Sequence, residues 1–162
     1  MLEDKNFIHI AAEIATASKC VSKRVGAVIE KEGRIISTGY NGSPKGHINC
    51  DELFEEWSKD HHIWSHKYEI HAEMNALIWA ARKGISIEGG TIYVTLEPCD
   101  QCTKNLIAAG IKKIVYTSKY EHVNSEELRN FIEEHKIEYI YMPIEAEKFD
   151  DLLKKKWLDS NK

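Results

Sequence analysis

Residues 91–102 read TIYVTLEPCDQC and carry the clearest structural signal in the chain. The first half is an apolar run rich in β-branched residues, which predicts a strand, and Pro98 leads from it into a helical pattern. The two cysteines therefore stand at the start of a helix, where a thiol loses its proton more easily. Upstream, His71-Ala72-Glu73 opens a second predicted helix that ends at Gly84. We expect both helix starts to contribute to one site.

The remainder of the chain alternates between predicted strands and helices. The predicted helices cover residues 6–17, 72–83, 100–109, 125–135 and 145–158, and the predicted strands cover residues 25–29, 34–38, 91–95, 113–117 and 138–142. In the helix over residues 72–83, helical spacing predicts that Met74, Leu77, Ile78 and Ala81 face inward. This alternation implies a layered α/β domain in which part of the sheet is parallel.

Length and composition predict one enzyme-sized domain. The 162 residues are 43% hydrophobic and 30% charged, which is ordinary for a globular protein with a single core. A net charge of −4 argues against a polynucleotide-binding surface and favours a small substrate. The sequence predicts neither a signal peptide nor a membrane span, so we expect a cytoplasmic protein without a membrane partner. Its four cysteines are then expected to be reduced thiols or metal ligands.

The two motifs supply the donors of a catalytic zinc site. His71, Cys99 and Cys102 offer one nitrogen and two sulfurs. Three protein ligands leave the fourth position of a tetrahedral zinc ion to water, whose pKa falls to about 7 from about 15.7. Glu73 lies close to the expected metal without binding it, and we expect it to carry protons. His-x-Glu followed by Pro-Cys-x-x-Cys is the signature of zinc-dependent base deaminases. The alternative is a purely structural zinc site, which would need a fourth protein ligand.

Between residue 6 and about residue 120 the chain resembles the deoxycytidylate (dCMP) deaminases, in particular their bacteriophage-type branch. The resemblance implies a three-layer α/β/α cytidine-deaminase fold with a five-stranded mixed sheet, and hydrolysis of dCMP to dUMP and ammonia for dTMP synthesis. It also implies a homohexamer that dCTP activates and dTTP inhibits, each with Mg²⁺. The stretches that carry the resemblance are Val25-Gly26-Ala27-Val28-Ile29, Gly39-Tyr40-Asn41-Gly42-Ser43-Pro44, His71-Ala72-Glu73-Met74-Asn75-Ala76 and Pro98-Cys99-Asp100-Gln101-Cys102.

The same resemblance implies a second, structural zinc ion. It would stabilise an inserted segment, at about residues 46–69, within a single domain over residues 1–162. The matching pattern assigns its ligands to Cys20, Cys50, His61 and Glu69, all of which are suitable residue types. His62 and His66 are alternative ligands, because residues i and i+4 share one face of a helix. In the competing interpretation, the cysteines are buried small hydrophobes and the histidines lie on the surface.

Substrate and effector contacts are predicted mainly from the resemblance. It points to the sugar and phosphate region at Ser22, Lys23, Arg24 and Asn41. Ala72 lies beside the catalytic histidine, and Tyr120, just past the strand predicted over residues 113–117, is expected to close over the ligand. The glycine-rich loop around Gly42 is expected to hold a substrate phosphate or a triphosphate effector. Trp79 and Arg82 are linked to subunit packing and regulation. Tyr120 as a merely packed side chain and Arg82 as a solvent-facing one are the alternatives.

Two other functions share parts of this pattern. A deaminase of the same fold acting on a nucleoside, a free base, or a base in tRNA or single-stranded DNA would carry the same zinc motif. The acidic net charge and the absence of a basic and aromatic stripe count against the polynucleotide versions. A catalytically silent nucleotide-binding module would require Glu73 to be a bystander.

Overall fold

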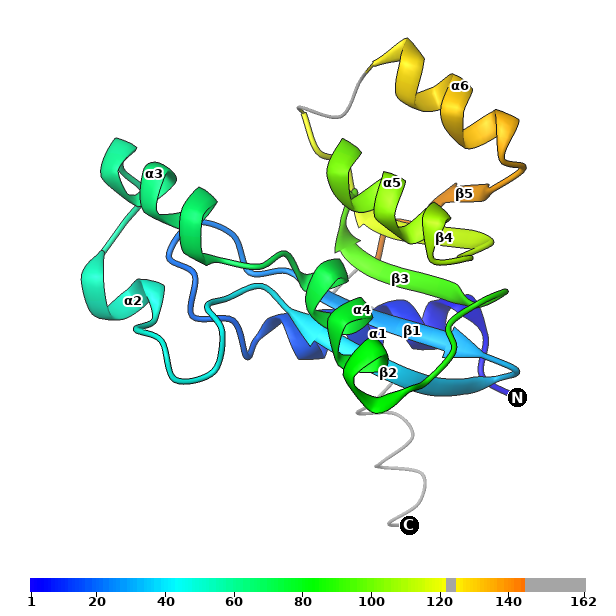
Figure 1. Ribbon diagram of the computed structural model, residues 1–162, viewed down its shortest axis with the longest axis horizontal. Coiled ribbons are helices and arrows are strands. Elements are labelled where there is room, and N and C mark those ends of the chain that lie inside the picture. The colour runs from blue at the N-terminus through cyan, green and yellow to red at the C-terminus, as the bar shows by residue number, and fades with distance from the viewer. Residues whose placement is uncertain (122–124, 145–162) are drawn as a thin grey trace, which may run out of the picture.

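A five-stranded mixed sheet forms the centre of the protein, whose computed structural model describes residues 1–121 and 125–144 (Figure 1). The strand order is β2-β1-β3-β4-β5. Strand β1 pairs antiparallel with both β2 and β3, whereas β3, β4 and β5 are parallel, so the predicted mixed sheet is confirmed. The strands are β1 (Gly26–Lys31), β2 (Arg34–Tyr40), β3 (Thr91–Leu96), β4 (Lys113–Ser118) and β5 (Glu138–Tyr141).

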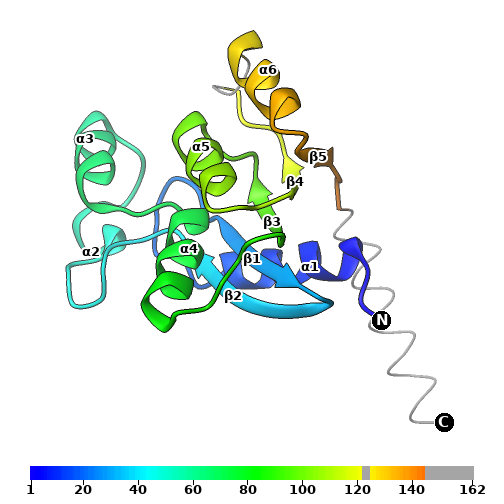
Figure 2. The same ribbon diagram turned by 45° about the vertical axis from the view of Figure 1, so that its right-hand side comes forward.

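Helices cover both faces of this sheet and make it the middle of three layers (Figures 1 and 2). On one face, α1 buries Phe7 and Ile8 against alternate strand residues such as Val28 and Val115. The opposite face carries the larger core, in which α4 and α5 pack over the intervening strand residues. The helices are α1 (Asp4–Ala15), α2 (Cys50–Leu53), α3 (Lys59–Tyr68), α4 (Ala72–Lys83), α5 (Asp100–Ala108) and α6 (Glu126–Glu134).

Helix α4 lies unusually close to the hairpin formed by β1 and β2. A Cβ atom at Gly39 would stand 2.6 Å from the backbone nitrogen of Ala76 and would clash with the carbonyl oxygen of Ala72. The hydroxyl of Ser37 donates a hydrogen bond of 2.6 Å to the carbonyl of Ala76 across the same contact. The buried face of α4 therefore consists mainly of small residues, Ala72, Ala76 and Ala80, together with Glu73.

This close packing corrects one expectation from helical spacing. Ile78 and Ala81 do not face inward: Ile78 is 42% exposed, and Ala81 is exposed as well. Leu77 packs against the edge of the core. The helix has the predicted bounds, but its phase is set by the contact with Gly39, which only small side chains fit. The helix predicted over residues 145–158 lies outside the described residues.

The segment between β2 and α4 projects from one end of the sheet and contains α2 and α3 (Figures 1 and 2). Ser58 caps the start of α3, and its hydroxyl accepts a hydrogen bond from the backbone N–H of His61. A short antiparallel bridge between Gly42 and Ile70 joins the two ends of the segment. None of the helices in the described part of the chain is long and apolar enough to cross a membrane.

Candidate active site

Three metal-ligating side chains meet where the N-termini of α4 and α5 approach each other. His71 is the residue that caps α4, and Cys99 is the residue that caps α5. The Nδ1 atom of His71 lies 3.6 Å from the sulfur of Cys99 and 3.4 Å from that of Cys102. The structure thus brings together the three predicted donors, which come from segments 28 and 31 residues apart in the chain.

The protonation of these groups reflects their proximity. A hydrogen bond from Cys102, assisted by His71, lowers the pKa of the Cys99 thiol to about 4. The pKa of Cys102 is raised well above its usual value by that same hydrogen bond and by burial. The hydrogen bond with Cys99 also raises the pKa of His71. One thiolate is therefore already favoured, and the positive ends of two helices favour negative charge at the same point.

Glu73 lies on the first turn of α4 and is only 4% exposed. Burial raises the pKa of its carboxyl group to about 7, because the charged form loses its hydration. A carboxyl group with this pKa can both accept and donate a proton at neutral pH. Among the described residues, the metal-ligating group at this point contains His71, Cys99 and Cys102 and no fourth side chain, so Glu73 stands beside it as a separate acid or base.

A pocket of about 340 Å³ opens over these residues. This volume suits a small organic ligand. The lining includes His71, Glu73 and Cys99 and five of the residues predicted to contact substrate, namely Ser22, Lys23, Asn41, Ala72 and Tyr120. Residues predicted to contact substrate therefore line the same cavity as part of the metal-ligating group.

Asn41 holds the wall of the pocket that carries Lys23. Its side-chain oxygen accepts a hydrogen bond from the backbone N–H of Val25, and its amide nitrogen donates to the carbonyl of Lys23, each at 2.8 Å. The ammonium group of Lys23 lies 4.5 Å from the centre of the Tyr120 ring, within range of a cation–π contact. Both polar atoms of the Asn41 side chain therefore bind the backbone of the segment that carries Lys23, and they position this segment.

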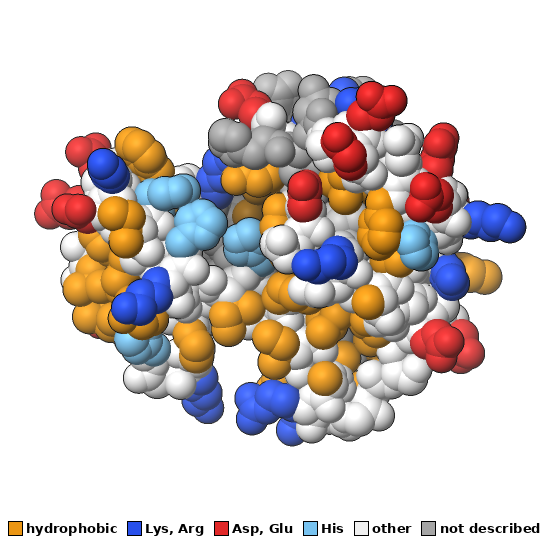
Figure 3. Space-filling model, turned by 45° about the horizontal axis from the view of Figure 1, so that its top comes forward, with side chains coloured by type: hydrophobic (Ala, Val, Ile, Leu, Met, Phe, Trp, Pro, Cys, Tyr) orange, Lys and Arg blue, Asp and Glu red, His pale blue; other side chains and the backbone are white. Residues whose placement is uncertain are grey.

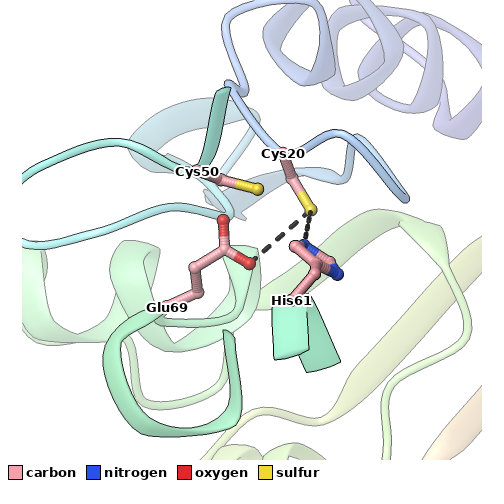
Figure 4. A group of neighbouring side chains, drawn as sticks. All are labelled: Cys20, Cys50, His61 and Glu69. Atoms are coloured by element: carbon pink, nitrogen blue, oxygen red, sulfur yellow. Dashed lines mark hydrogen bonds between the residues drawn. The ribbon is translucent and has the colours of Figure 1, made fainter. Parts of the chain in front are cut away.

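A second group of ligand-type side chains lies beside this pocket. Cys20, Cys50, His61 and Glu69 each place one ligand atom within 4.8 Å of the others (Figure 4). The sulfur of Cys20 is 3.8 Å from Nε2 of His61 and 3.6 Å from a carboxylate oxygen of Glu69. Figure 4 shows the four side chains pointing toward a common centre. These are the four residues that the family resemblance assigned.

The chemistry of this group suits a bound cation. Burial, together with the neighbouring acidic groups of Cys20 and Glu69, raises the pKa of the Cys50 thiol to about 11. One oxygen of Glu69 is buried and has no hydrogen-bond partner within the described structure. Two thiols, an imidazole and a carboxylate form a donor set that zinc accepts, and a cation would offset the crowding of acidic groups.

Two alternative ligands considered from sequence lie elsewhere. His62 and His66 are exposed, and they are absent from this group of described side chains because they lie on another face of α3. His61 is buried, with 3% of its surface exposed. Both His62 and His66 line the active-site pocket, as do Cys20, His61 and Glu69 of the second group.

Four other predicted residues lie away from the pocket lining. Arg24 is exposed beside Lys23, and Gly42 forms the bridge with Ile70. Trp79 and Arg82 lie on the outer face of α4, where the guanidinium carbon is 6.0 Å from the indole ring. The structure thus separates these residues from the substrate pocket and does not test their predicted roles.

Sequence reasoning missed several residues of the pocket wall. Trp57 and Glu97 line it, together with the two exposed histidines of α3. Glu97 accepts hydrogen bonds from the backbone N–H of Tyr120, at 3.1 Å, and from the hydroxyl of Tyr139, at 3.0 Å. The position of Glu97 directly before Pro98 and Cys99 could have indicated that it lies near the site. No sequence pattern places Trp57 at the pocket, because it comes from the projecting segment between β2 and α4.

The mixed sheet, and the metal-ligating residues at the starts of α4 and α5, are those of a zinc-dependent deaminase. Comparison with known proteins identifies the family. Residues 1–118 match the model of the cytidine and deoxycytidylate deaminase zinc-binding region. The chain therefore belongs to the cytidine and deoxycytidylate deaminase family. Membership supports Zn²⁺ as the metal of the site.

Similar proteins include several phage deoxycytidylate deaminases. The chain is 45% identical to the deoxycytidylate deaminase of Enterobacteria phage T2 over 148 positions, covering 70% of this chain and 79% of that protein. It is 44% identical to that of Enterobacteria phage T4, covering 70% and 77%. A crystal structure of dCMP deaminase from the cyanophage S-TIM5, in complex with dCMP and dUMP, superposes with a TM-score of 0.71 at 27% identity. That match covers 88% of this chain and all of the other.

Proposed function

We propose that this protein hydrolyses dCMP to dUMP and ammonia and so supplies dUMP for dTMP synthesis. The observation that carries the proposal is the convergence of His71, Cys99 and Cys102 beside the buried carboxyl group of Glu73, at one end of a nucleotide-sized pocket. Relatives at 44–45% identity are deoxycytidylate deaminases, and a similar structure holds dCMP and dUMP.

His71, Cys99 and Cys102 would hold the catalytic zinc ion. When bound, zinc lowers the pKa of water and makes hydroxide available at neutral pH. The deprotonated Cys99 and the two helix N-termini prepare this site for a cation with anionic ligands.

Glu73 moves the protons of the reaction. Its carboxylate accepts one proton from water and delivers it to N3 of the cytosine ring, while the oxygen of that water forms a bond to C4. The carboxylate then accepts the second proton, from the new hydroxyl group on C4, and delivers it to the exocyclic nitrogen. The C4–N bond breaks, C4 becomes a carbonyl carbon and ammonia leaves. The raised pKa of Glu73, about 7, matches both directions of this transfer. Glu73 is almost fully buried, which shields its carboxyl group from bulk water.

The Glu73→Gln variant tests this assignment. It should retain the metal, because Glu73 is not among the ligand-type groups, and should lose about 10²- to 10⁴-fold in turnover of dCMP. Ammonia release and zinc content are the measurements. Near-normal turnover by this variant would refute the mechanism. Wild-type activity on deoxycytidine, CMP or an oligonucleotide in preference to dCMP would refute the substrate.

A structural zinc ion at Cys20, Cys50, His61 and Glu69 is the second part of the proposal. The supporting observations are the 4.8 Å clustering of four donor atoms and the unpartnered oxygen of Glu69. We expect two zinc ions per chain in the wild-type protein and one in Cys50→Ser, measured by elemental analysis. A single zinc ion in the intact protein would contradict this assignment. The ion would tie the inserted segment to the rest of a single domain.

Regulation and assembly complete the proposed function. We infer a homohexamer activated by dCTP and inhibited by dTTP, each with Mg²⁺, in which the loop at Gly42 binds effectors and Trp79 and Arg82 contact other subunits. The exposure of Trp79, at 47%, supports a role outside the monomer core. A dCMP saturation curve with and without each nucleotide tests the regulation, and sedimentation tests the assembly. The proposed location is the cytoplasm, which suits four free cysteines in ligand groups.

A further inference from the structure

The active-site pocket has a wall of nitrogen-bearing side chains that the deamination chemistry does not use. His62 and His66 lie one turn apart on α3, with ring centres 4.8 Å apart and ring planes at 77° to each other. Both side chains are exposed and both line the pocket. Figure 3 shows histidine side chains gathered where the projecting segment faces the body of the protein across a hollow.

Lys23 lines the same pocket from the segment that precedes β1. Three nitrogen-bearing side chains, two from α3 and one from this segment, therefore face the same space. Among the described residues, the ion pairs are Lys5 with Glu3 and Lys113 with Asp4, so no carboxylate in this part of the chain neutralises the ammonium group of Lys23. The pocket wall thus offers donors to an anion that comes from outside the protein.

The acidic residues of the pocket are engaged elsewhere. Glu73 belongs to the reaction centre, and Glu69 points to Cys20 and accepts a hydrogen bond of 2.6 Å from Ser65. Glu97 accepts hydrogen bonds from Tyr120 and Tyr139. The pocket is therefore divided, with carboxylates committed to the metal-ligating groups and the β3 side, and imidazole and ammonium groups on the remaining walls.

We propose that His62 and His66, together with Lys23, form the subsite for the 5′-phosphate of the substrate and so select a nucleotide over a nucleoside. Imidazole N–H groups and an ammonium group are suitable donors to phosphate oxygens, and hydrogen bonds to a charged acceptor are the strong ones. The pair in edge-to-face contact presents two donors from one helix face. This inference depends on the proposed function for the identity of the substrate. It adds His62 and His66 to Lys23 as the residues that recognise its charged end.

Binding to the Glu73→Gln protein tests the subsite without turnover. Calorimetry compares dCMP, deoxycytidine and inorganic phosphate on that protein and on the same protein carrying His62→Asn and His66→Asn. The expected result is a loss of about 10- to 100-fold in dCMP affinity with unchanged deoxycytidine affinity. Lysine at both positions should restore the preference for dCMP, because its ammonium N–H groups again donate to the phosphate oxygens. Zinc content and thermal unfolding show whether each variant retains its fold and the ion beside His61.

The matched control is Lys67→Gln, which removes a positive charge from an exposed position of the same helix outside the pocket lining. It should leave both affinities unchanged. Equal losses for dCMP and deoxycytidine in the double histidine variant, or no loss for dCMP, would overturn the proposal. A wild-type protein that prefers dCMP in binding but releases no ammonia from it would refute the proposed function and leave the phosphate subsite standing.

Discussion

The close contact between α4 and β2 makes a sharp prediction for Gly39→Ala. The new Cβ atom would lie 2.6 Å from the backbone nitrogen of Ala76 and still closer to the carbonyl oxygen of Ala72, whereas ordinary van der Waals contact begins near 3.4 Å. Helix α4 must therefore retreat by at least about 0.8 Å. Overpacking of this kind destabilises a protein by about 1–3 kcal/mol. The same helix carries His71 and Glu73, and a misplacement of about 1 Å at a reaction centre costs on the order of 10²-fold in rate.

The matched comparison is Gly26→Ala, which overpacks α1 instead. Its Cβ atom would lie 2.5 Å from the backbone nitrogen of Ala15 and would clash with the carbonyl of Ala11. Helix α1 carries no residue of the active site. Urea unfolding should show similar losses of stability for the two variants, whereas kcat for dCMP should fall much further in Gly39→Ala. Equal kcat values in the two variants, or unchanged stability in Gly39→Ala, would refute the reasoning.

Two further predictions concern stability. Burial alone would raise the pKa of Asp4, but hydrogen bonds from Lys113 and Tyr93, at 2.6 and 2.7 Å, outweigh it and lower the pKa. Asp4→Asn should therefore cost about 0.2–1 kcal/mol at neutral pH, and the difference from wild type should vanish as the pH falls below about 4; a difference that persists at pH 2 would contradict this. Ser37→Ala removes the buried hydrogen bond to Ala76 and should cost about 1 kcal/mol in urea unfolding with little change in kcat.

The catalytic donors could be predicted from sequence because each motif fixes its own surroundings. A strand that turns through Pro98 into a helix places Cys99 and Cys102 on one helix start, and His71 caps its helix in the same way. The structure adds the meeting of these two starts, which depends on how α4 and α5 pack on the sheet. Element bounds agree to within about two residues for the same reason, since caps and glycines mark them locally.

The rotation of α3 and α4 about their axes could not be predicted from sequence, because it depends on packing between distant segments. Helical spacing assigned Ile78 to the core, but the closeness of Gly39 leaves room only for alanine side chains. The choice of His61 over its neighbours as a candidate ligand depends on the rotation of α3 relative to Cys20, which no local pattern encodes. The family resemblance supplied that choice.

The group at Cys20, Cys50, His61 and Glu69 links parts of the chain that are far apart in sequence. Cys20 and Glu69 are 49 residues apart, and an ion held between them would act as a cross-link that closes a long loop. Such a link reduces the disorder of the unfolded chain far more than a local contact does. On heating, the segment between β2 and α4 would then open only as fast as the ion dissociates. A chelator that removes the ion would therefore shorten the lifetime of the folded protein.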